Sequence, residues 1–532
     1  MYPGLHATTH PDRPAVIMSG SGARITYREL DERSTRLARL WHRHGLRPGD
    51  TVALVAENQV RYPEVVWAAL RSGLYLTAVN WHLAPAEAAW LVQDSGARAL
   101  VATKRFGATA VEIARRAPAC GLRLMMDGTE DGFDSYEEAL AASSAEPLAE
   151  QPRGEFMLYS SGTTGRPKGI RRPLSGDPVD RPARGGIAAM GTFLFGMDES
   201  SVYLCPAPLY HAASLQWAVC VHELGGTLVV MEKFDERAAL AAIERERITH
   251  VQVVPTMLVR LLKLPAETRL GADVSSLRRV MHAAAPCPVE VKRAVIDWVG
   301  PIVDEYYSGT EGCGVTYISC ADWLAHPGSV GRALVGVPRI CDDEGREVPA
   351  GTPGLLYFER DEAPFEYHGD PEKTRASRHP DHPNWTTCGD LGYLDPDGYL
   401  YLTDRKNFTI ISGGVNIYPA EVEAALVMHP QVADVAVFGL PDQEMGEYVH
   451  AVVQPVDGVE GTPELAERLR AFARGSLAGF KVPRVVVFRS ELPRMPTGKL
   501  AKGQLRAEYL PATTAATATA TATASTIATS TS

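Results

Sequence analysis

The sequence of 532 residues contains no run of about eighteen apolar residues, so we expect no membrane span. Residues 1–13 include Pro, His and Asp and no apolar stretch, which argues against a secretory signal. The eight cysteines occur singly, without the short paired spacings typical of zinc sites or disulfide frameworks. This pattern favours reduced thiols and a cytoplasmic protein. The net charge of −11 argues against nucleic acid as the main partner.

The composition is that of an ordinary globular protein, with 45% hydrophobic and 22% charged residues. A chain of this length is too long for a single core, so two or more domains are expected. Thr26 and Glu29 form a capping-box pattern that predicts the start of a helix, and Gly45 marks its end. Short apolar strands alternate with helices through residues 51–102 and again through residues 202–283. This alternation indicates an α/β fold in which parallel-rich sheets are flanked by helices.

The pattern changes near residue 400, where a turn and a short strand are followed by a polar connection. Beyond it, the helices and strands predict a smaller α+β domain. The end of the chain is uncharged and rich in Ala, Thr and Ser, which favours disorder. The predicted organisation is a large domain at 1–402, a hinge at 403–407, a small domain at 408–510 and a disordered tail at 511–532.

Residues 159–169 (Tyr-Ser-Ser-Gly-Thr-Thr-Gly-Arg-Pro-Lys-Gly) combine glycines, hydroxyl groups and a lysine at the end of an apolar strand, 156–159. Glycines let the backbone approach a ligand closely and turn successive N–H groups toward anionic oxygens. Open α/β sheets bind ligands where strands end, so this composition predicts a polyphosphate-binding loop. The residues expected to contact phosphate are Ser160, Ser161, Gly162, Thr163, Thr164, Gly165 and Lys168.

Two other interpretations of this segment are a Ser/Gly-rich surface turn and a Walker phosphate loop. A Walker loop needs Gly-Lys-Ser/Thr at the start of a helix. Here Lys168 is followed by Gly169, and Pro173 comes soon after, which argues against a helix. The segment therefore predicts a nucleotide loop of another kind, with the surface turn as the alternative when the segment is taken alone.

Four further segments carry groups that suit nucleotide chemistry. The first offers an aromatic face, a hydroxyl and a carboxylate of the kind that Mg²⁺ binds together with phosphates. The second places a carboxylate between glycines, the third leaves a slot free of side chains, and the fourth presents a lysine on a rigid turn. Taken alone, each is more often an ordinary turn or surface group. The segments are 306–312 (Tyr-Tyr-Ser-Gly-Thr-Glu-Gly), 388–392 (Cys-Gly-Asp-Leu-Gly), 411–419 (Ile-Ser-Gly-Gly-Val-Asn-Ile-Tyr-Pro) and 493–499 (Pro-Arg-Met-Pro-Thr-Gly-Lys).

In this order and at these spacings, the segments resemble the motifs of the adenylate-forming superfamily, which includes acyl-CoA synthetases, adenylation domains of peptide synthetases and luciferase-like enzymes. The resemblance covers residues 10–509 and points to the acyl-CoA synthetase (fatty-acid–CoA ligase) branch. It implies a large N-terminal domain and a small mobile C-terminal domain. It also implies ATP, CoA and a small-molecule carboxylic acid as substrates, with Mg²⁺ as the cofactor.

The resemblance also implies a role for each matching residue. Residues 160–165 and Lys168 would hold the β- and γ-phosphates, with Thr164 and Glu311 at the Mg²⁺. Adenine would lie against Tyr307, Ser308, Ala284 and Ala285, and Asp390 and Arg405 would take the ribose or phosphates. Lys499 matches the catalytic lysine, with Thr310 at the α-phosphate and His211 at the acyl carboxylate. The chain departs from the family at Asn407, where Asp or Lys is usual, and at Ser308, where Gly is commoner.

The resemblance places the acyl pocket among mostly apolar residues and the CoA slot at a glycine pair. Amino-acid-activating relatives usually keep an aspartate for the α-ammonium, and residues 210–215 contain none. We therefore expect an apolar acid, either a medium- or long-chain fatty acid or an aryl or polycyclic carboxylate. The pocket residues are Tyr210, Trp217, Met281, Gly309 and Gly314, and the CoA slot is Gly413 and Gly414.

These residues imply a two-step reaction in which the acid attacks the α-phosphorus of MgATP and a thiol then attacks the acyl adenylate. Between the steps, the small domain would rotate and replace Lys499 with the Gly413–Gly414 segment. Three functional classes remain: an acid–CoA ligase, an adenylating enzyme that serves a carrier-protein thiol or an amine, and a non-catalytic nucleotide-binding module. The retained Lys499 and Glu311 argue against the third. The sequence is also compatible with a homodimer.

Overall fold

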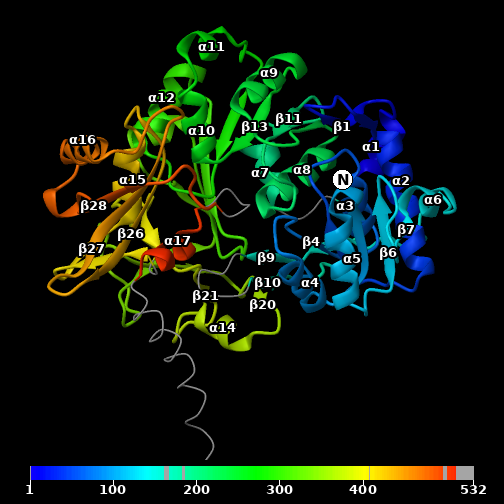
Figure 1. Cartoon of the computed structure of the whole chain (residues 1–532). Helices are drawn as coiled ribbons and strands as arrows, with labels where there is room; N and C mark the ends of the chain where they lie inside the picture. Colours follow the sequence, from blue (N-terminus) through cyan, green and yellow to red (C-terminus); the bar gives the residue numbers. More distant parts are fainter. Residues whose placement is uncertain (1, 161–166, 182–185, 406–407, 495–499, 511–532) are drawn as a thin grey trace, which may run out of the picture. The chain divides into compact units, whose positions relative to one another are not determined.

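The computed structural model describes residues 2–160, 167–181, 186–405, 408–494 and 500–510. The chain divides into two compact units (Figure 1). Unit 1 comprises Met1–Ala284, Lys292–Pro338 and Phe358–Cys388, and unit 2 comprises Ala285–Val291, Arg339–Tyr357 and Gly389–Ser532. Strands β18 (Val337–Cys341) and β19 (Gly354–Glu359) and helix α12 (Val289–Val299) each have residues in both units.

The largest sheet of unit 1 has nine strands in the order β17-β16-β15-β14-β13-β11-β12-β1-β2. Its six central strands run parallel, and antiparallel strands β2, β16 and β17 close its two edges. The bounds are β1 (Pro14–Met18), β2 (Arg24–Thr26), β11 (Val202–Cys205), β12 (Thr227–Val230), β13 (His250–Val253), β14 (Arg279–His282), β15 (Val303–Ser308), β16 (Val315–Ile318) and β17 (Arg332–Val335).

A second sheet of unit 1 has six parallel strands in the order β7-β6-β5-β3-β4-β8. Its bounds are β3 (Thr51–Val55), β4 (Tyr75–Ala78), β5 (Ala97–Thr103), β6 (Leu122–Met126), β7 (Asp134–Ser135) and β8 (Glu155–Phe156). Side chains of α2 (Tyr27–Arg43), α3 (Tyr62–Leu70) and α8 (Ala212–Leu224) share one core with both sheets. Helices α4 (Pro85–Asp94) and α5 (Gly107–Arg116) cover the other face of the six-stranded sheet.

The remaining elements of unit 1 include a small three-stranded sheet in the order β20-β10-β9. Its strands are β9 (Leu158–Ser160), β10 (Lys168–Arg171) and β20 (Glu366–Tyr367), and β21 (Trp385–Thr386) pairs with the Phe358–Glu359 end of β19. The other helices are α1 (Pro3–Thr9), α6 (Tyr136–Ala141), α7 (Ile187–Phe193), α9 (Glu236–Glu246), α10 (Pro255–Leu262), α11 (Ala266–Gly271), α13 (Cys320–Ala325) and α14 (Pro371–Ala376).

Unit 2 is built around the long hairpin of β26 (Val432–Asp442) and β27 (Gly446–Pro455). Alternate residues of β26 face opposite sides, as the pleat requires. One side packs on α15 (Pro419–Val427) and α16 (Pro463–Arg474), and the other packs on α17 (Lys502–Tyr509). The other strands of unit 2 are β22 (Asp390–Leu394), β23 (Leu400–Arg405), β24 (Ile410–Ser412), β25 (Val415–Ile417) and β28 (Val485–Phe488).

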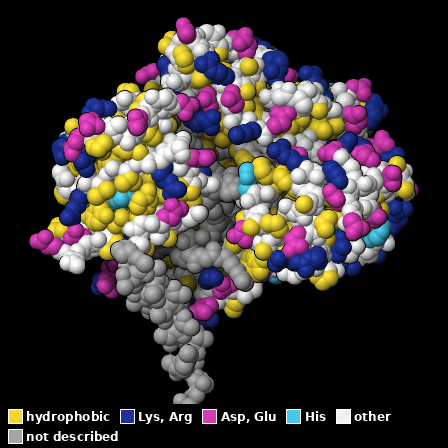
Figure 2. Space-filling view, in the orientation of Figure 1, with side chains coloured by type: hydrophobic (Ala, Val, Ile, Leu, Met, Phe, Trp, Pro, Cys, Tyr) yellow, Lys and Arg dark blue, Asp and Glu magenta, His cyan; other side chains and the backbone are white. Residues whose placement is uncertain are grey.

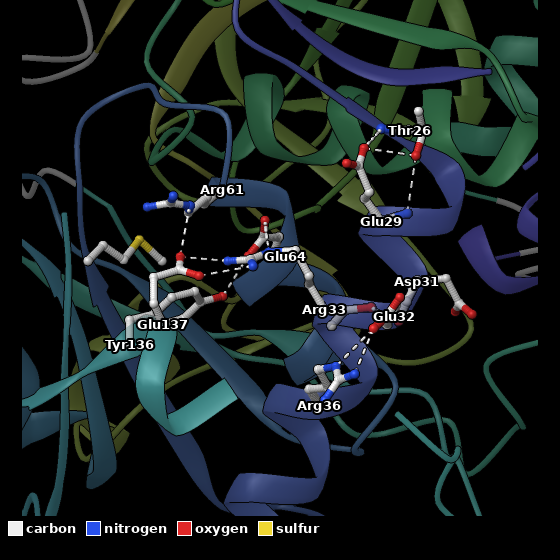
Figure 3. Close-up of polar contacts among 12 residues, drawn as sticks. Thr26, Glu29, Asp31, Glu32, Arg33, Arg36, Arg61, Glu64, Tyr136 and Glu137 are labelled. Carbon is white, nitrogen blue, oxygen red and sulfur yellow. Dashed lines mark hydrogen bonds and ion pairs between the residues drawn. The ribbon is translucent and has the colours of Figure 1, made fainter. Parts of the chain in front are cut away.

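The structure confirms the predicted α/β class, with large parallel-rich N-terminal sheets and a small C-terminal domain. It also confirms the helix predicted after Thr26, which is α2: Thr26 and Glu29 form the reciprocal capping box (Figure 3). The chain leaves this helix through Gly45 at φ +80°. The domain boundary at 403–407 stays a prediction. Residues 406–407 and the tail at 511–532 lie outside the described residues.

Two local predictions were wrong. The polar connection begins later than expected, because residues 403–405 continue β23 and pair with the start of β22. The apolar strand predicted at 156–159 is split between two sheets, since β8 joins the parallel sheet and β9 joins the small antiparallel one. At residues 403–405, backbone pairing with β22 thus outweighed the polar composition. At residues 156–159, the strand is interrupted because its two parts pair with different partner strands.

Lys and Arg side chains are interspersed with Asp and Glu over the face drawn in Figure 2. None of the helices in the described part of the chain has the length and hydropathy needed to cross a bilayer.

Candidate active site

The β9–β10 hairpin carries the segment predicted to bind phosphate. Ser160 and Lys168 are antiparallel partners at its end, next to the pair of Tyr159 and Gly169. Tyr159 donates a hydrogen bond from its hydroxyl to Asp94 Oδ2 at 2.7 Å, which ties the incoming strand to the end of α4. Lys168 is therefore fixed by its strand pairing at one end of the loop. Of the predicted phosphate ligands, Ser161, Gly162, Thr163, Thr164 and Gly165 lie outside the described residues.

One tyrosine contacts both a cation and a carboxylate that were predicted separately. The Lys168 ammonium lies 4.7 Å from the centre of the Tyr367 ring, within the range of a cation–π interaction. The Tyr367 hydroxyl donates a hydrogen bond to Glu311 Oε1 at 3.1 Å. Burial, reinforced by the charge of Glu311, raises the pKa of Tyr367, so the phenol stays protonated and remains a donor. The structure thus brings Lys168 and Glu311 to the same side chain.

Glu311 lies at the turn that follows β15. Its second oxygen, Oε2, is 3.8 Å from Cys388 Sγ, whose S–H donates to it. The preceding residue, Thr310, is held through its carbonyl, which accepts a hydrogen bond from Arg172 at 3.0 Å. Mg²⁺ typically takes one or two carboxylates together with phosphate and water oxygens, and Glu311 is a ligand of that kind. The Glu311 carboxylate is of the type that the predicted metal role needs, and that role stays a prediction; Thr164, the other predicted metal ligand, lies outside the described residues.

The predicted adenine-binding residue Tyr307 stacks on Phe358, with ring centroids 6.3 Å apart and an interplanar angle of 27°. A side chain at Gly314 would occupy the space of that phenyl ring, so glycine is required for the stack to form. Ser308 donates a hydrogen bond from its hydroxyl to the Gly314 carbonyl at 3.0 Å and closes the turn between β15 and β16. Gly309 has a comparable restriction, because an added Cβ would lie 2.7 Å from Cys388 Sγ.

The predicted acyl-pocket residues occupy the core beside β14 and β15. Trp217 is fully buried and donates a hydrogen bond from Nε1 to the Tyr306 hydroxyl at 3.0 Å. Met281 is also fully buried, and Tyr210 stacks edge-on against His211 with centroids 4.3 Å apart. The structure therefore places these side chains in or against an apolar core. Their role in acyl binding stays a prediction.

Ala284 has a positive φ of 73°, a conformation that an alanine adopts only at a cost in backbone strain. It ends the segment after β14 that was predicted to border adenine. Ala285, predicted beside it, belongs to unit 2. Strain of this kind persists only where the surrounding structure imposes it, and it is concentrated at ligand sites.

Unit 2 contains the predicted ribose ligands. Arg405 donates from Nε to Asp390 Oδ1 at 3.0 Å, and the two residues are cross-strand partners at the ends of β22 and β23. Gly413 and Gly414, predicted for the CoA slot, have φ of +57° and +76° in the β24–β25 turn. A side chain at Gly413 would lie 2.5 Å from Met445 Cε. Lys499, the predicted catalytic lysine, lies outside the described residues.

The sequence did not single out Tyr367, Arg172 or Phe358, although each contacts a predicted site residue. Tyr367 and Glu311 are 56 residues apart, and the hydrogen bond that joins them has no local sequence signal. Phe358 lies in the apolar strand β19, where an aromatic residue is expected in any case. Only the tertiary structure brings these residues to the site.

Comparison with known proteins shows the family of this chain. The family model described as "AMP-binding enzyme" matches residues 5–363, and the one described as "AMP-binding enzyme C-terminal domain" matches residues 421–499. The chain belongs to the AMP-binding enzyme family. The match covers the β9–β10 hairpin and Glu311, and the C-terminal match ends at Lys499.

Individual members of the family are similar over nearly the whole chain. A feruloyl-CoA synthase from Amycolatopsis sp is 34% identical, covering 96% of this chain and 98% of the relative. The fatty acid–[acyl-carrier-protein] ligase ScoC from Streptomyces coeruleorubidus is 32% identical, covering 95% of each chain. The structure of the amide bond synthetase McbA from Marinactinospora thermotolerans superposes with a TM-score of 0.76 at 27% identity, covering 95% of this chain and 99% of that one.

Proposed function

We propose that this protein is a cytoplasmic, ATP-dependent acid–CoA ligase that forms acyl-AMP and pyrophosphate and then acyl-CoA and AMP. One observation carries the proposal: Tyr367 contacts both Lys168, at the end of the phosphate-loop hairpin, and Glu311. A cation and a carboxylate fixed on one side chain suit the phosphate chain of ATP and the divalent ion bound to it. The single, unpaired spacing of the eight cysteines along the sequence supports the cytoplasmic location.

In the first step, an oxygen of the acid attacks the α-phosphorus of ATP in line, and pyrophosphate leaves. Because the two reactants are anions, catalysis depends on positioning and on stabilisation of negative charge. We assign Lys168 and residues 160–165 to the β- and γ-phosphates, and Thr310 to the α-phosphate. Lys499 would bridge the acid and the α-phosphate, with His211 beside the acid.

Glu311, with Thr164, would hold a bound Mg²⁺, which neutralises charge on the phosphates. Tyr367 keeps the Glu311 carboxylate oriented through its hydroxyl. In unit 2, Asp390 would accept hydrogen bonds from the ribose hydroxyls, and Arg405 would share that contact. Stacking on Tyr307, beside Ala284, Ala285 and Ser308, would hold the adenine.

In the second step, a thiol attacks the acyl carbonyl and AMP leaves. We propose that the small domain, residues 408–510, contributes Lys499 in the first step, and that its rotation about residues 403–407 then replaces Lys499 with the Gly413–Gly414 turn for the pantetheine. Both glycines are exposed at that turn, and the Gly413 N–H donates a hydrogen bond to the Met445 carbonyl at 2.7 Å, which holds the turn in shape. The domain division 1–402 and 408–510 is part of this proposal.

The acid is proposed to be apolar, a medium- or long-chain fatty acid or an aryl carboxylate, in a pocket formed by Tyr210, Trp217, Met281, Gly309 and Gly314. The buried Trp217 and Met281 support an apolar lining. The printed names of the relatives, which include feruloyl and fatty-acid substrates, support the same class.

A second candidate is an adenylating enzyme that passes the acyl group to a carrier-protein thiol or an amine. The similarity to the carrier-protein ligase ScoC and to the amide bond synthetase McbA favours this alternative specifically. A screen of carboxylic acids for pyrophosphate release, with CoA, a carrier protein or an amine as acceptor, distinguishes the candidates. Acyl-CoA formation from an apolar acid is the expected result, and a product only with an amine or carrier protein contradicts the CoA assignment.

Lys499→Ala tests the assignment of the two steps. Removing a preorganised donor of this kind costs about 10²–10³ in rate, so adenylation should fall by that factor. Thioester formation from supplied acyl adenylate should persist, because the lysine is proposed to be absent from that step. Lys481→Ala, which removes a cation paired with Glu421 elsewhere in unit 2, is the matched control. Equal loss of both half-reactions in a folded Lys499 variant contradicts the proposal.

A further inference from the structure

Two cysteines that are distant in sequence meet beside Glu311. Cys313 Sγ and Cys388 Sγ are 3.4 Å apart, a sulfur–sulfur contact between residues 75 positions apart in the chain. Cys388 Sγ is also the thiol that lies 3.8 Å from Glu311 Oε2. The thiols of Cys205 and Cys220 instead donate hydrogen bonds to the carbonyls of Ala207 and Ile187, respectively.

The two thiols differ in accessibility. Cys388 is partly exposed, whereas Cys313 is buried with only 2% of its surface accessible. A small oxidant can therefore reach Cys388 first, and Cys313 is positioned to resolve the product. In a disulfide the sulfurs are about 2.05 Å apart, so a modest side-chain movement from the present separation would close the bond.

We propose that Cys313 and Cys388 form a reversible regulatory disulfide that slows adenylation. The oxidant is a peroxide. The Cys388 sulfur attacks one peroxide oxygen and becomes a sulfenic acid, and water leaves. The Cys313 sulfur then attacks the Cys388 sulfur, the S–S bond forms and a second water leaves. For hydrogen peroxide the balance is two thiols plus one peroxide giving one disulfide and two waters, and a dithiol reductant reverses the change.

The consequence for activity rests on the proposed function. A disulfide has no S–H, so Glu311 would lose the hydrogen bond that Cys388 donates to it. The bond would also attach the Gly312–Cys313 turn to Cys388. Thr310 and Glu311 lie between Gly309, which has Cys388 Sγ against it, and this turn. The residues proposed to meet the α-phosphate and Mg²⁺ would therefore be restrained from both sides.

Cysteines of intracellular proteins that do form disulfides are usually catalytic or redox-sensing. In the proposed mechanism, Cys388 and Cys313 perform no chemical step. A contact between two thiols at the phosphate end of the site is therefore best explained as a redox-sensitive pair.

The test uses the full-length protein, with and without a small excess of hydrogen peroxide. Peptide mapping under non-reducing conditions should find Cys313 and Cys388 cross-linked in the oxidised sample, with the joined peptides lighter by two hydrogen atoms. Exchange of pyrophosphate into ATP should fall about tenfold on oxidation, equivalent to about 1.4 kcal/mol in activation free energy, and recover with dithiothreitol. Cys313→Ser and Cys388→Ser should each abolish the cross-link and the reversible component of the loss.

Cys287→Ser is the matched control, since it removes another partly exposed thiol. The ratio of its pyrophosphate-exchange rates, oxidised to reduced, should equal that of the wild type. Absence of the cross-link, or oxidation of Cys388 to a sulfinic acid without it, overturns the disulfide. A cross-link that leaves pyrophosphate exchange unchanged overturns its regulatory role. If reduced protein shows no exchange with any acid while the cross-link still forms, the proposed function has failed and the disulfide has not.

Discussion

Trp67 donates a hydrogen bond from its indole Nε1 to His222 Nδ1 at 3.1 Å, deep in the core shared by the two sheets of unit 1. The other ring nitrogen, Nε2, lies 3.1 Å from the Ala15 carbonyl and must carry the proton to donate to it. Since Nδ1 accepts and Nε2 donates, His222 is neutral, and a second proton would face an N–H group. Burial lowers its pKa from 6.5 to about 4.

This histidine predicts a defined loss of stability in acid. The folded-state pKa lies below the unfolded value. The contribution of neutral His222 to the free energy of unfolding is therefore complete above about pH 6.5 and is lost progressively as the pH falls toward 4. The shift corresponds to about 3 kcal/mol at most. Urea unfolding followed by tryptophan fluorescence at several pH values should show a smaller loss in His222→Gln than in the wild type. Equal losses in both proteins would contradict the neutral, buried state of His222.

A buried carboxylate holds α2, α3 and α6 together (Figure 3). Glu64 is fully buried, and it accepts hydrogen bonds from Arg33 Nε at 2.7 Å and from the Tyr136 hydroxyl at 2.9 Å. Glu64→Gln should lower the free energy of unfolding by about 2–3 kcal/mol, because two donors lose a charged acceptor. Arg33 keeps its contacts with Glu137, which limits the loss.

Glu32→Gln is the control for that measurement, since the Glu32–Arg36 pair is solvent-exposed and lies on the same helix (Figure 3). Its removal should cost less than about 1 kcal/mol in urea unfolding. Costs of similar size for the two variants would show that the Glu64 network contributes little.

Tyr367→Phe separates the two contacts of that side chain. The ring beneath Lys168 is retained, and the hydrogen bond to Glu311 is lost. We expect kcat/KM for pyrophosphate exchange to fall and the MgCl₂ concentration for half-maximal rate to rise. A double-mutant cycle with Glu311→Gln should give a coupling of about 1 kcal/mol or more. Tyr401→Phe is the control, and additive effects would indicate that Tyr367 does not act through Glu311.

Gly314→Ala should disturb the ring stack without changing any charge. The new Cβ would overlap the Phe358 ring, which must then move away from Tyr307. We expect weaker ATP binding in calorimetry, with the far-UV circular dichroism retained. Gly121→Ala, where an added Cβ meets no atom within 4 Å, should leave ATP affinity unchanged. Wild-type affinity in Gly314→Ala would contradict the adenine assignment of Tyr307.

Periodicity and capping were sufficient to predict the alternating elements of unit 1. The Thr26 capping box forms where the sequence places it, because its signal is local. The predicted end of β23 was too early because Asp404 and Arg405 are residue types common in loops. Only their pairing with β22 keeps them extended. Local composition does not indicate which strand will pair with a segment.

The candidate site could be predicted only as separate segments. Glycine and hydroxyl patterns predict a phosphate loop, and the turn after β15 predicts a metal role for Glu311; both stay predictions. The contact that joins them runs through Tyr367, which comes from a two-residue strand with no distinguishing pattern. The pairing of Cys313 with Cys388 was missed for the same reason, since residues 75 positions apart meet only in the folded chain.

Because Ser160 and Lys168 are cross-strand partners, the pairing of β9 with β10 holds the two ends of the phosphate-loop segment together. A residue inserted outside the two strands leaves their register intact. One inserted into β9 or β10 would instead turn every later side chain of that strand to the opposite face. Insertions in either strand should therefore be tolerated less well than substitutions there, because the pairing of Ser160 with Lys168 sets which face of β10 carries the Lys168 side chain.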